Sequence, residues 1–449
     1  GAPEREVIFM LIKNGTIVTM NPAREIIKGD ILIEEDRIIR VGDCSGARSD
    51  TVINAAGKLV IPGLIQSHVH LCQVLFRGMA DDMELLDWLN KRIWPLENAH
   101  DEGSLYYSSL LGCAELLRGG TTSIIDMATV KHTGAVFQAA ADSGIRYLGG
   151  KCMMDAGSEN AALLREDTTA SLTESVDLLQ KWNHACDGRL RYAFCPRFVP
   201  SCSEQLLAEV KDLSGKYRVP VHTHASENKA EIQLVERQKG VRNIVYLNRL
   251  GLCNENLILA HCVHVDRQEQ QILAQNQVNV VHCPSANLKL ASGIAPVPDL
   301  LEQGTSVSLG ADGAPCNNNL SMFVEMRLAA LIQKPFYGPV SMPARHVFEM
   351  ATLNGARAMG MSDRLGSLEP GKKADIVLID TDKWHTRPLG AADIYAQLVY
   401  QVQTQDVCCT IVDGKIIMKE GHLLNVAESE LKPQIEQAHK RVCERAGIE

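Results

Sequence analysis

Several features that would assign the chain to particular protein classes are missing from its sequence. None of its 14 cysteines forms a C-x-x-C pair, and most stand singly in apolar stretches, which predicts reduced thiols. Because no secretory signal is recognisable at the N-terminus, we expect a cytoplasmic protein. No apolar run reaches the ~18 residues that a membrane span needs, so we expect no membrane partner.

Runs of Lys and Arg are missing as well, and the formal net charge is −9. An acidic chain without basic clusters is not expected to bind nucleic acid or an anionic membrane surface through general electrostatic attraction. What is present is a composition of 45% hydrophobic and 22% charged residues. This composition is typical of a soluble globular protein with a large core.

Short stretches of alternating polarity lie near both ends of the chain. Residues 31–42 (ILIEEDRIIRVG), 372–380 (KKADIVLID) and 408–421 (CCTIVDGKIIMKEG) have the pattern of half-buried strands, and Asp413-Gly414 is a hairpin signal. We predict one small β-sandwich domain formed from both termini, with a large α/β region between its two parts. The predicted boundaries are residues 1–57 and 364–449 for the sandwich domain, including a terminal helix, and 58–363 for the inserted region.

Eight apolar or β-branched runs follow one another through the inserted region, separated by amphipathic stretches. They are LVIPGLIQSHVH, TTSIIDM, IRYLGGKC, LRYAFCPR, VPVHTHAS, LILAHCVH, VNVVHCPSAN and SVSLGADG. Apolar strands alternating with helices are typical of a parallel sheet that is covered on both faces. Eight such repeats predict a (β/α)₈ TIM barrel, and the predicted fold class is α/β.

Polar residues gather at the C-terminal ends of these runs, where the catalytic groups of a barrel converge. They are His68, His70, Asp126, Arg197, His222, His224, His261, His282 and Asp312.

Several of these residues have the chemistry of a metal site. His68 and His70 stand two apart on one strand and therefore share a face, while His224 and Asp312 end two other runs. Three neutral imidazoles and one carboxylate suit zinc, with iron as the second choice. Such a cation would lower the pKa of its water toward ~7. His222 competes with His224 for the ligand position, and Asp312 alone would be interpreted as a turn residue.

Glu227 and His261 are candidates for proton transfer beside such a cation. Glu227 follows His224 by three residues and would reach the water as a general base, while His261 would hydrogen-bond the nucleophile. Taken alone, Glu227 is equally explained as a helix-start carboxylate and His261 as a buried structural histidine. His264, three residues further on, is predicted to be structural.

The segments PGLIQSHVH, HTHASEN, AHCVH, HCPSANLKLASGIAPV and GADGAPCNN resemble the amidohydrolase superfamily, and most of all its branch of adenosine- and guanine-type deaminases and triazine hydrolases. The resemblance extends over nearly the whole chain. It implies that the metal ligands are His68, His70, His224 and Asp312. It further implies that Glu227 shuttles protons, that His261 assists at the metal-bound water, and that Asp312 accepts the second proton. His222 falls outside the family's ligand position.

The resemblance also bears on the number of metal ions and on partners. Two-metal relatives commonly carry a modified Lys on the fourth strand, and LRYAFCPR has no Lys, so we expect one divalent cation. The H-x-E and P-C-x-x-C pattern of cytidine deaminases is missing. The family implies a homo-oligomer, and the C-terminal segment ESELKPQIEQAHKRVCERAG could contact a neighbouring copy.

The activity implied is that of an aminohydrolase of purine metabolism, which uses water to replace an amino group on a small nitrogen heterocycle with oxygen. The residues expected at the substrate are Gln73, Trp88, Glu97 and Arg197. Arg197, a cation with donors only, and Gln73 match guanine deaminases, and they favour a guanine-like base.

Alternatives to a guanine-like substrate stay open. FRGMADDMELLDWLNKRIWPLE and NNNLSMFVEMRLAALIQK resemble 5-methylthioadenosine/S-adenosylhomocysteine deaminases, in which Glu97 would hold ribose hydroxyls. Triazine amino- or chlorohydrolysis would use the same residues. A catalytically dead scaffold of the same fold is disfavoured, because all four ligands and Glu227 are retained.

Overall fold

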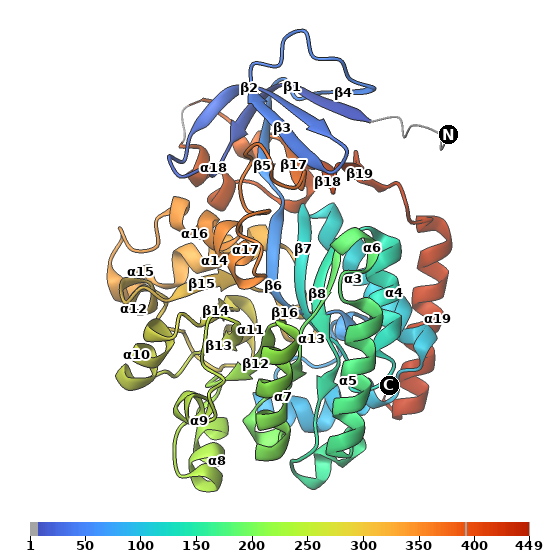
Figure 1. The fold of residues 1–449 in the computed structure, drawn as a ribbon, viewed down its shortest axis with the longest axis vertical. Helices are drawn as coiled ribbons and strands as arrows, with labels where there is room; N and C mark the ends of the chain where they lie inside the picture. The colour runs from blue at the N-terminus through green and yellow to red at the C-terminus, as the bar shows by residue number, and fades with distance from the viewer. Residues whose placement is uncertain (1–7, 391–392, 449) are drawn as a thin grey trace.

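Strands from the N-terminal and C-terminal parts of the chain form one sheet in the computed structural model, which describes residues 8–390 and 393–448 (Figure 1). Within these residues the sheet has nine strands, in the order β20-β19-β18-β17-β5-β1-β2-β3, with β4 paired to β1. They are β1 (Phe9–Val18), β2 (Ile26–Glu34), β3 (Arg37–Gly42), β4 (Thr51–Asn54), β5 (Lys58–Pro62), β17 (Ile376–Asp380), β18 (Val407–Val412), β19 (Lys415–Lys419) and β20 (His422–Leu423). The antiparallel pairing of β5 with β17 joins the N-terminal strands to the C-terminal ones.

The predicted Asp413-Gly414 hairpin forms between β18 and β19. Both residues have positive φ, 48° and 70°, as the two central residues of a type I′ turn require. Asp and Gly are among the residues that adopt this conformation most readily, so the turn follows directly from the sequence.

The remaining strands pair in parallel and run through the centre of the molecule below the terminal sheet (Figure 1). They are β6 (Leu64–His70), β7 (Thr121–Met127), β8 (Arg146–Gly150), β9 (Cys152–Met153), β10 (Leu190–Tyr192), β11 (Cys195–Pro196), β12 (Val221–Ala225), β13 (Leu257–His261), β14 (Asn279–His282), β15 (Ser306–Leu309) and β16 (Asp312–Gly313). Their orders are β10-β8-β7-β6-β16, β11-β9 and β12-β13-β14-β15. Each of the eight apolar runs contains at least one of these strands, although the first run also includes β5 of the terminal sheet.

Helices cover the outside of the parallel strands (Figure 1). The longer ones are α3 (Glu102–Arg118), α4 (Thr133–Ser143), α5 (Thr168–Trp182), α7 (Glu204–Tyr217), α8 (Lys229–Lys239), α9 (Asn243–Arg249), α10 (Arg267–Gln275), α14 (Met322–Ile332), α16 (Ala344–Met350), α18 (Ile394–Tyr400) and α19 (Glu428–Ala446). The shorter ones are α1 (Leu85–Trp88), α2 (Trp94–Asn98), α6 (Ala185–Gly188), α11 (Pro284–Lys289), α12 (Val297–Glu302), α13 (Ala314–Asn317), α15 (Lys334–Tyr337) and α17 (Leu353–Ala358). Every residue of β6, β7, β8 and β13 is buried, as expected for parallel strands with both faces covered. The protein is therefore an α/β protein.

The C-terminal helix α19 packs against its own chain. Ala438 and Val442 are buried with Leu75 and Phe76 in one apolar cluster, and His439 Nδ1 donates to Leu75 O at 2.8 Å. The apolar face of this helix is therefore already used within the subunit.

A buried ion network connects the terminal sheet to the parallel strands. Arg146 on β8 donates from Nε and Nη2 to the two carboxylate oxygens of Asp375, at 2.8 and 2.9 Å. Its Nη2 also contacts Asp413 in the β18–β19 turn, and Lys373 Nζ lies 3.3 Å from the same carboxylate. Arg146 is 1% exposed, so its charge depends entirely on these partners.

None of the helices formed by the described residues combines the length and the apolar character that crossing a bilayer requires.

Candidate active site

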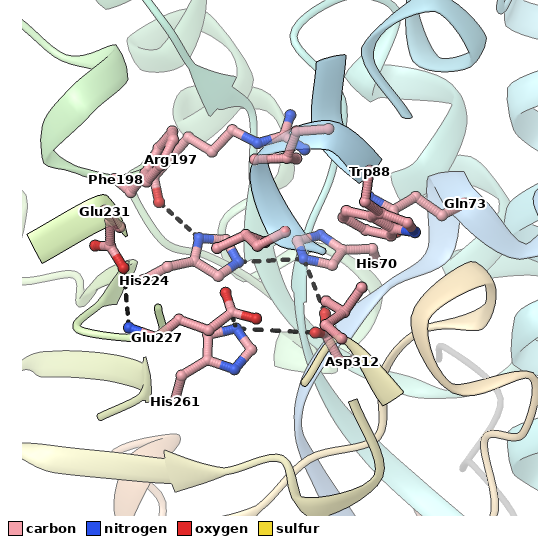
Figure 2. A pocket seen from close by; sticks show the side chains of 13 residues that line it. His70, Gln73, Trp88, Arg197, Phe198, His224, Glu227, Glu231, His261 and Asp312 are labelled. Atoms are coloured by element: carbon pink, nitrogen blue, oxygen red, sulfur yellow. Dashed lines mark hydrogen bonds and ion pairs between the residues drawn. The ribbon is translucent and has the colours of Figure 1, made fainter. Parts of the chain in front are cut away.

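The carboxyl ends of four parallel strands bring the expected polar residues to one place (Figure 2). His68 and His70 come from β6, His224 from β12 and His261 from β13, while Asp312 opens β16. Strand β16 pairs with β6 so that Asp312 lies opposite Val69, between the two histidines. The pairing of the strands therefore brings these residues together, although most of them lie far apart in the sequence.

Two of these residues have unusual backbone conformations. His261 has φ of 77° and Asp312 has φ of 62°, a left-handed region that costs energy for residues other than Gly. Neither residue is a glycine, so this cost applies to both. His261 is the last residue of β13 and Asp312 the first residue of β16, so both bends lie where a strand begins or ends.

The ring nitrogens of these histidines and the Asp312 carboxylate lie close together. Nε2 of His68 and Nε2 of His70 lie 3.2 and 3.3 Å from Asp312 Oδ1. Nε2 of His224 lies 3.2 Å from Nε2 of His70. Two sets of potential ligand atoms, His68/His224/His261 and His68/His70/Asp312, each lie within 4.8 Å of one another.

The other nitrogen of each of the three rings is already engaged. His70 Nδ1 donates to Met127 O at 3.0 Å and His224 Nδ1 donates to Arg197 O at 2.6 Å. His68 Nδ1 shares a hydrogen bond of 2.8 Å with His222 Nε2. A neutral ring that donates from Nδ1 to a carbonyl keeps an unprotonated Nε2. In this form the Nε2 lone pairs of His70 and His224 face the interior of the cluster.

This arrangement fits a divalent cation. His68 Nε2 is buried and makes no hydrogen bond despite its contact with Asp312. Tetrahedral zinc with bonds of about 2.0–2.1 Å places neighbouring ligand atoms roughly 3.3 Å apart. The observed separations match that edge length, and nitrogen and carboxylate donors suit zinc.

Charges in the cluster also suit a cation. Burial lowers the pKa of His68 to about 4 and that of His224 well below its usual range, so both rings are neutral. Burial alone would raise the pKa of Asp312, but its contacts with His68 and His70 lower it well below its usual range. For His70 the Asp312 carboxylate outweighs burial and raises the pKa.

Glu227 and His261 lie side by side next to this cluster (Figure 2). Glu227 Oε2 is 3.3 Å from His261 Nε2, which is in turn 3.8 Å from Asp312 Oδ2. Burial raises the pKa of Glu227 to about 7, and the Asp312 and Glu231 carboxylates add to the increase while His261 opposes it. A carboxyl group with a pKa near neutrality can both accept and return a proton.

Glu231, which the sequence analysis missed, fixes the backbone of Glu227. Its buried carboxylate accepts hydrogen bonds from the backbone N–H groups of Ser226 at 3.3 Å, Glu227 at 2.9 Å and Asn228 at 3.4 Å. Asn228 and Glu231 form the capping box of α8, and the N-x-x-E pattern in the sequence is a signal that could have identified it.

Two other polar residues at strand ends support the cluster from behind. His222 contacts only His68 of the cluster, so its position orients that ring and leaves the ligand position to His224. Asp126 accepts from Leu71 N and from the Tyr147 hydroxyl, both at 2.8 Å. It thereby fixes the turn that follows His70.

His264 Nε2 donates to Ser292 O at 2.6 Å, a structural contact as predicted.

A cavity opens beside the cluster. Its lining includes the expected substrate residues Gln73, Trp88 and Arg197, together with apolar side chains. The apolar ones are Leu85, Leu89, Phe198 and Leu290. Gln73 is fully buried. It is therefore not a solvated amide in a surface loop, which would be the alternative to a role at the substrate.

Glu97 lies behind Arg197 and Gln73 and is not part of the cavity lining. Arg197 Nη1 and Nη2 donate to its two carboxylate oxygens at 2.8 and 3.2 Å, and Gln73 Nε2 donates at 2.8 Å. Burial alone would raise the pKa of Glu97, but the Arg197 charge and the hydrogen bonds from Arg197 and Gln73 lower it. Much of the donor capacity of Arg197 is therefore used within the protein.

Comparison with known proteins agrees with this geometry. The sequence model of the "Amidohydrolase family" matches residues 59–417. The chain is 38% identical to the 5′-deoxyadenosine deaminase of Methanosarcina acetivorans, over 97% of this chain and 99% of that protein. It is 37% identical to the 5-methylthioadenosine/S-adenosylhomocysteine deaminase of Moorella thermoacetica, over 96% of this chain and 99% of that protein.

The fold of the chain is also similar to that of a solved structure. An adenosine deaminase from Xanthomonas campestris with bound zinc superposes with a TM-score of 0.90 at 29% identity, covering 96% of this chain and 98% of that one. The fold of the present chain is thus a TIM-barrel-like α/β fold.

Proposed function

The chain belongs to the amidohydrolase family, and from this premise we propose that it deaminates an adenosine-type nucleoside. It is an enzyme, a metal-dependent hydrolase that acts on C–N bonds other than peptide bonds in cyclic amidines, as its deaminase relatives are. The non-catalytic scaffold considered from the sequence is therefore set aside. The reactants are a small molecule and water.

The substrate preference drawn from the sequence is corrected. The sequence favours a guanine-like base because Gln73 and Arg197 match guanine deaminases and a guanidinium suits a ring carbonyl or acceptor nitrogen. In the structure the Arg197 guanidinium is paired with Glu97, and the relatives described above are named adenosine-type deaminases. Both observations support the alternative stated there, an adenosine-type nucleoside.

We propose His68, His70, His224 and Asp312 as the ligands of one zinc ion. The match of their separations to a zinc coordination edge is the single observation that carries the proposal. When bound, the ion makes water acidic enough to supply a nucleophile near neutral pH.

The protein's own groups then move the protons. Glu227 accepts a proton from the attacking water and gives it to the ring nitrogen beside the reacting carbon. Asp312 accepts the second proton and passes it to the leaving ammonia. His261, whose Nε2 lies 3.3 Å from Glu227 and 3.8 Å from Asp312, accepts a hydrogen bond from the attacking water.

We propose that Gln73, Trp88 and Arg197 contact the substrate and that Glu97 acts mainly through Arg197. The remaining donors of Arg197 suit an acceptor nitrogen of a purine ring. Trp88 adds an apolar aromatic surface for the base. In this arrangement Glu97 keeps Arg197 charged and oriented.

For the fold, we propose a closed (β/α)₈ barrel with a β-sandwich domain formed from the two termini. The bridges Phe194–Val221 and Phe198–His224 connect the β10 and β11 strands to β12, which supports closure. The division at residues 57 and 364 is kept except that β5, up to Pro62, pairs within the terminal sheet. Self-association, a cytoplasmic location and the absence of nucleic-acid partners stay predictions.

The reaction is tested by measuring ammonia release from 5′-deoxyadenosine, 5-methylthioadenosine, S-adenosylhomocysteine and guanine with the zinc-loaded enzyme. We expect kcat/KM for at least one nucleoside to exceed that for guanine by about tenfold or more, a difference of ~1.4 kcal/mol in transition-state binding. Faster turnover of guanine would reject the substrate class.

The proton-transfer role is tested with Glu227→Gln. Loss of a general base should lower kcat by about 10²–10⁴-fold, while the zinc content measured by elemental analysis stays at one per chain. Full activity in this variant would reject the scheme, and loss of zinc would move Glu227 into the ligand set.

A further inference from the structure

One short segment contacts both Glu227 and His261. It extends from Asn287 on α11 to Ser292 in the following turn, and neither residue is a metal ligand or a cavity-lining group. Asn287 is 1% exposed and Ser292 is 4% exposed. Both side chains are therefore held in place by the protein interior.

Asn287 contacts His261. Its Oδ1 accepts a hydrogen bond from His261 Nδ1 at 2.9 Å. A neutral imidazole carries one N–H, so an acceptor at Nδ1 leaves the lone pair on Nε2. That nitrogen is the one facing Glu227 and Asp312.

Ser292 contacts Glu227 from the same segment. Its hydroxyl donates to Glu227 Oε1 at 3.4 Å, on the carboxylate oxygen that does not face His261. The Ser292 N–H and the Gly293 N–H both donate to Asn287 O, at 2.8 and 3.3 Å. The two side chains are thus connected through one backbone carbonyl.

The position of the segment is fixed from outside as well. His264 donates from Nε2 to Ser292 O at 2.6 Å. Gly293 has φ of 133°, and a Cβ there would lie 3.2 Å from the His264 ring, so a glycine is needed for this approach. The turn therefore cannot move Ser292 without disturbing Asn287.

We propose that Asn287 and Ser292 are positioning residues of the deamination reaction. Asn287 selects the His261 tautomer that is unprotonated at Nε2, and Ser292 holds the Glu227 carboxylate so that its other oxygen faces that nitrogen. The expected effect of these residues on the reaction rate rests on the proposed function. The assignment of the His261 tautomer does not depend on it.

The kinetic experiment uses the zinc-loaded enzyme and the nucleoside it deaminates fastest. Asn287→Ala and Ser292→Ala should each lower kcat by about 10–100-fold, as loss of a supporting hydrogen bond typically does, with KM within about threefold and zinc content unchanged. Asn287→Asp keeps an acceptor at this position and should restore most of the loss. Leu288→Ala, at an exposed position on the same helix, is the matched control and should leave kcat unchanged.

Double variants separate positioning from general destabilisation. In a Glu227→Gln background Ser292→Ala should cause no further loss of kcat, because the group it positions is already inactive. The same holds for Asn287→Ala in a His261→Ala background. Losses that simply multiply in both backgrounds would overturn the proposal.

A measurement without substrate decides the tautomer. In histidine-¹⁵N-labelled enzyme, the His261 ring, assigned by comparison with His261→Gln, should show the Nδ1–H form in the wild type and in Asn287→Asp. It should lose that preference in Asn287→Ala. An Nε2–H form in the wild type would overturn the assignment even if the enzyme deaminates nucleosides. Conversely, an enzyme inactive on every nucleoside would reject the proposed function and leave this readout decisive.

Discussion

Glu325 on α14 holds together two loops at the carboxyl ends of the strands. Asn317 Nδ2 donates to its Oε1 at 2.8 Å, and the Ser285 N–H donates to its Oε2 at 3.2 Å. One loop leads to Asn287 and the other follows Asp312. A fully buried carboxylate thus supports both sides of the site without touching the cavity.

The stability of the protein should depend on pH through Glu325. Burial raises its pKa from 4.5 to about 7, against the opposing hydrogen bonds from Ser285 and Asn317. A raised folded-state pKa contributes stability that is complete below pH 4.5 and is lost as the pH rises through 7. The loss is about 3 kcal/mol, and Glu325→Gln, which cannot ionise, should remove it.

The measurement is the thermal unfolding midpoint of both proteins between pH 5 and 8. The wild type should lose more stability than Glu325→Gln as the pH rises, and the exposed Glu209→Gln on α7 should follow the wild type. Parallel pH profiles for wild type and Glu325→Gln would contradict the prediction.

Residue types at strand ends were predictable, whereas their supports were not. His68, His70, His224 and Asp312 stand out because a polar residue ending an apolar run is unusual in a buried strand. Glu231 has only the N-x-x-E pattern of a capping box as its signal, and Asn287 and Ser292 have none, since tertiary packing sets their partners. Arg197 lines the cavity, but its pairing with Glu97, a hundred residues away in sequence, depends on tertiary packing.

At the scale of elements, β8 and β10 pack unusually closely. A Cβ added at Gly150 would lie 2.0 Å from the backbone oxygen of Ala193 and 2.9 Å from Tyr192 Cζ. Backbone atoms cannot move aside as a flexible side chain can. The glycine at the end of β8 therefore sets the distance between neighbouring segments of the parallel sheet.

Gly150→Ala should destabilise the protein by about 1–3 kcal/mol, as overpacking in a close-packed interior does. Gly134 in α4 is the matched control, since a Cβ there meets nothing within 4 Å. Gly134→Ala should instead stabilise by about 0.4–1 kcal/mol. Chemical unfolding of both variants checks the pair, and equal effects of the two substitutions would contradict it.

The prediction of elements from sequence succeeded where periodicity was strong. Each apolar run contains a strand, but the first run is divided between two sheets because β5 turns away at Gly63. A Cβ at Gly63 would meet Thr122, and this close approach is invisible in a hydrophobicity pattern. The π-helical turn at Leu89–Ile93 likewise has no sequence signal.

At the scale of the whole molecule, the buried Arg146 network connects the terminal sheet to the strands that carry the site. Removing one partner of a buried ion pair leaves an uncompensated charge and typically costs about 3–5 kcal/mol. We expect this cost for Arg146→Met, which leaves the Asp375 carboxylate without its ion-pair partner, whereas Asp413 keeps Lys373.

A double-variant comparison checks this prediction. Arg146→Met combined with Asp375→Asn should recover part of the lost stability, because one stranded charge is neutralised. Lys91→Met breaks an exposed pair with Asp87 and should change stability by less than about 1 kcal/mol. A thermal midpoint for Arg146→Met equal to that of Lys91→Met would contradict the role of the network.

The pairing of β5 with β17 in the terminal sheet has a consequence for biosynthesis. While the chain emerges from the ribosome, β1 to β5 are complete long before Ile376–Asp380 has been made. Until then one edge of β5 has unpaired N–H and C=O groups. Such an edge can form hydrogen bonds with a strand of another nascent chain. The interval between synthesis of these two strands is the period in which this enzyme is most exposed to aggregation.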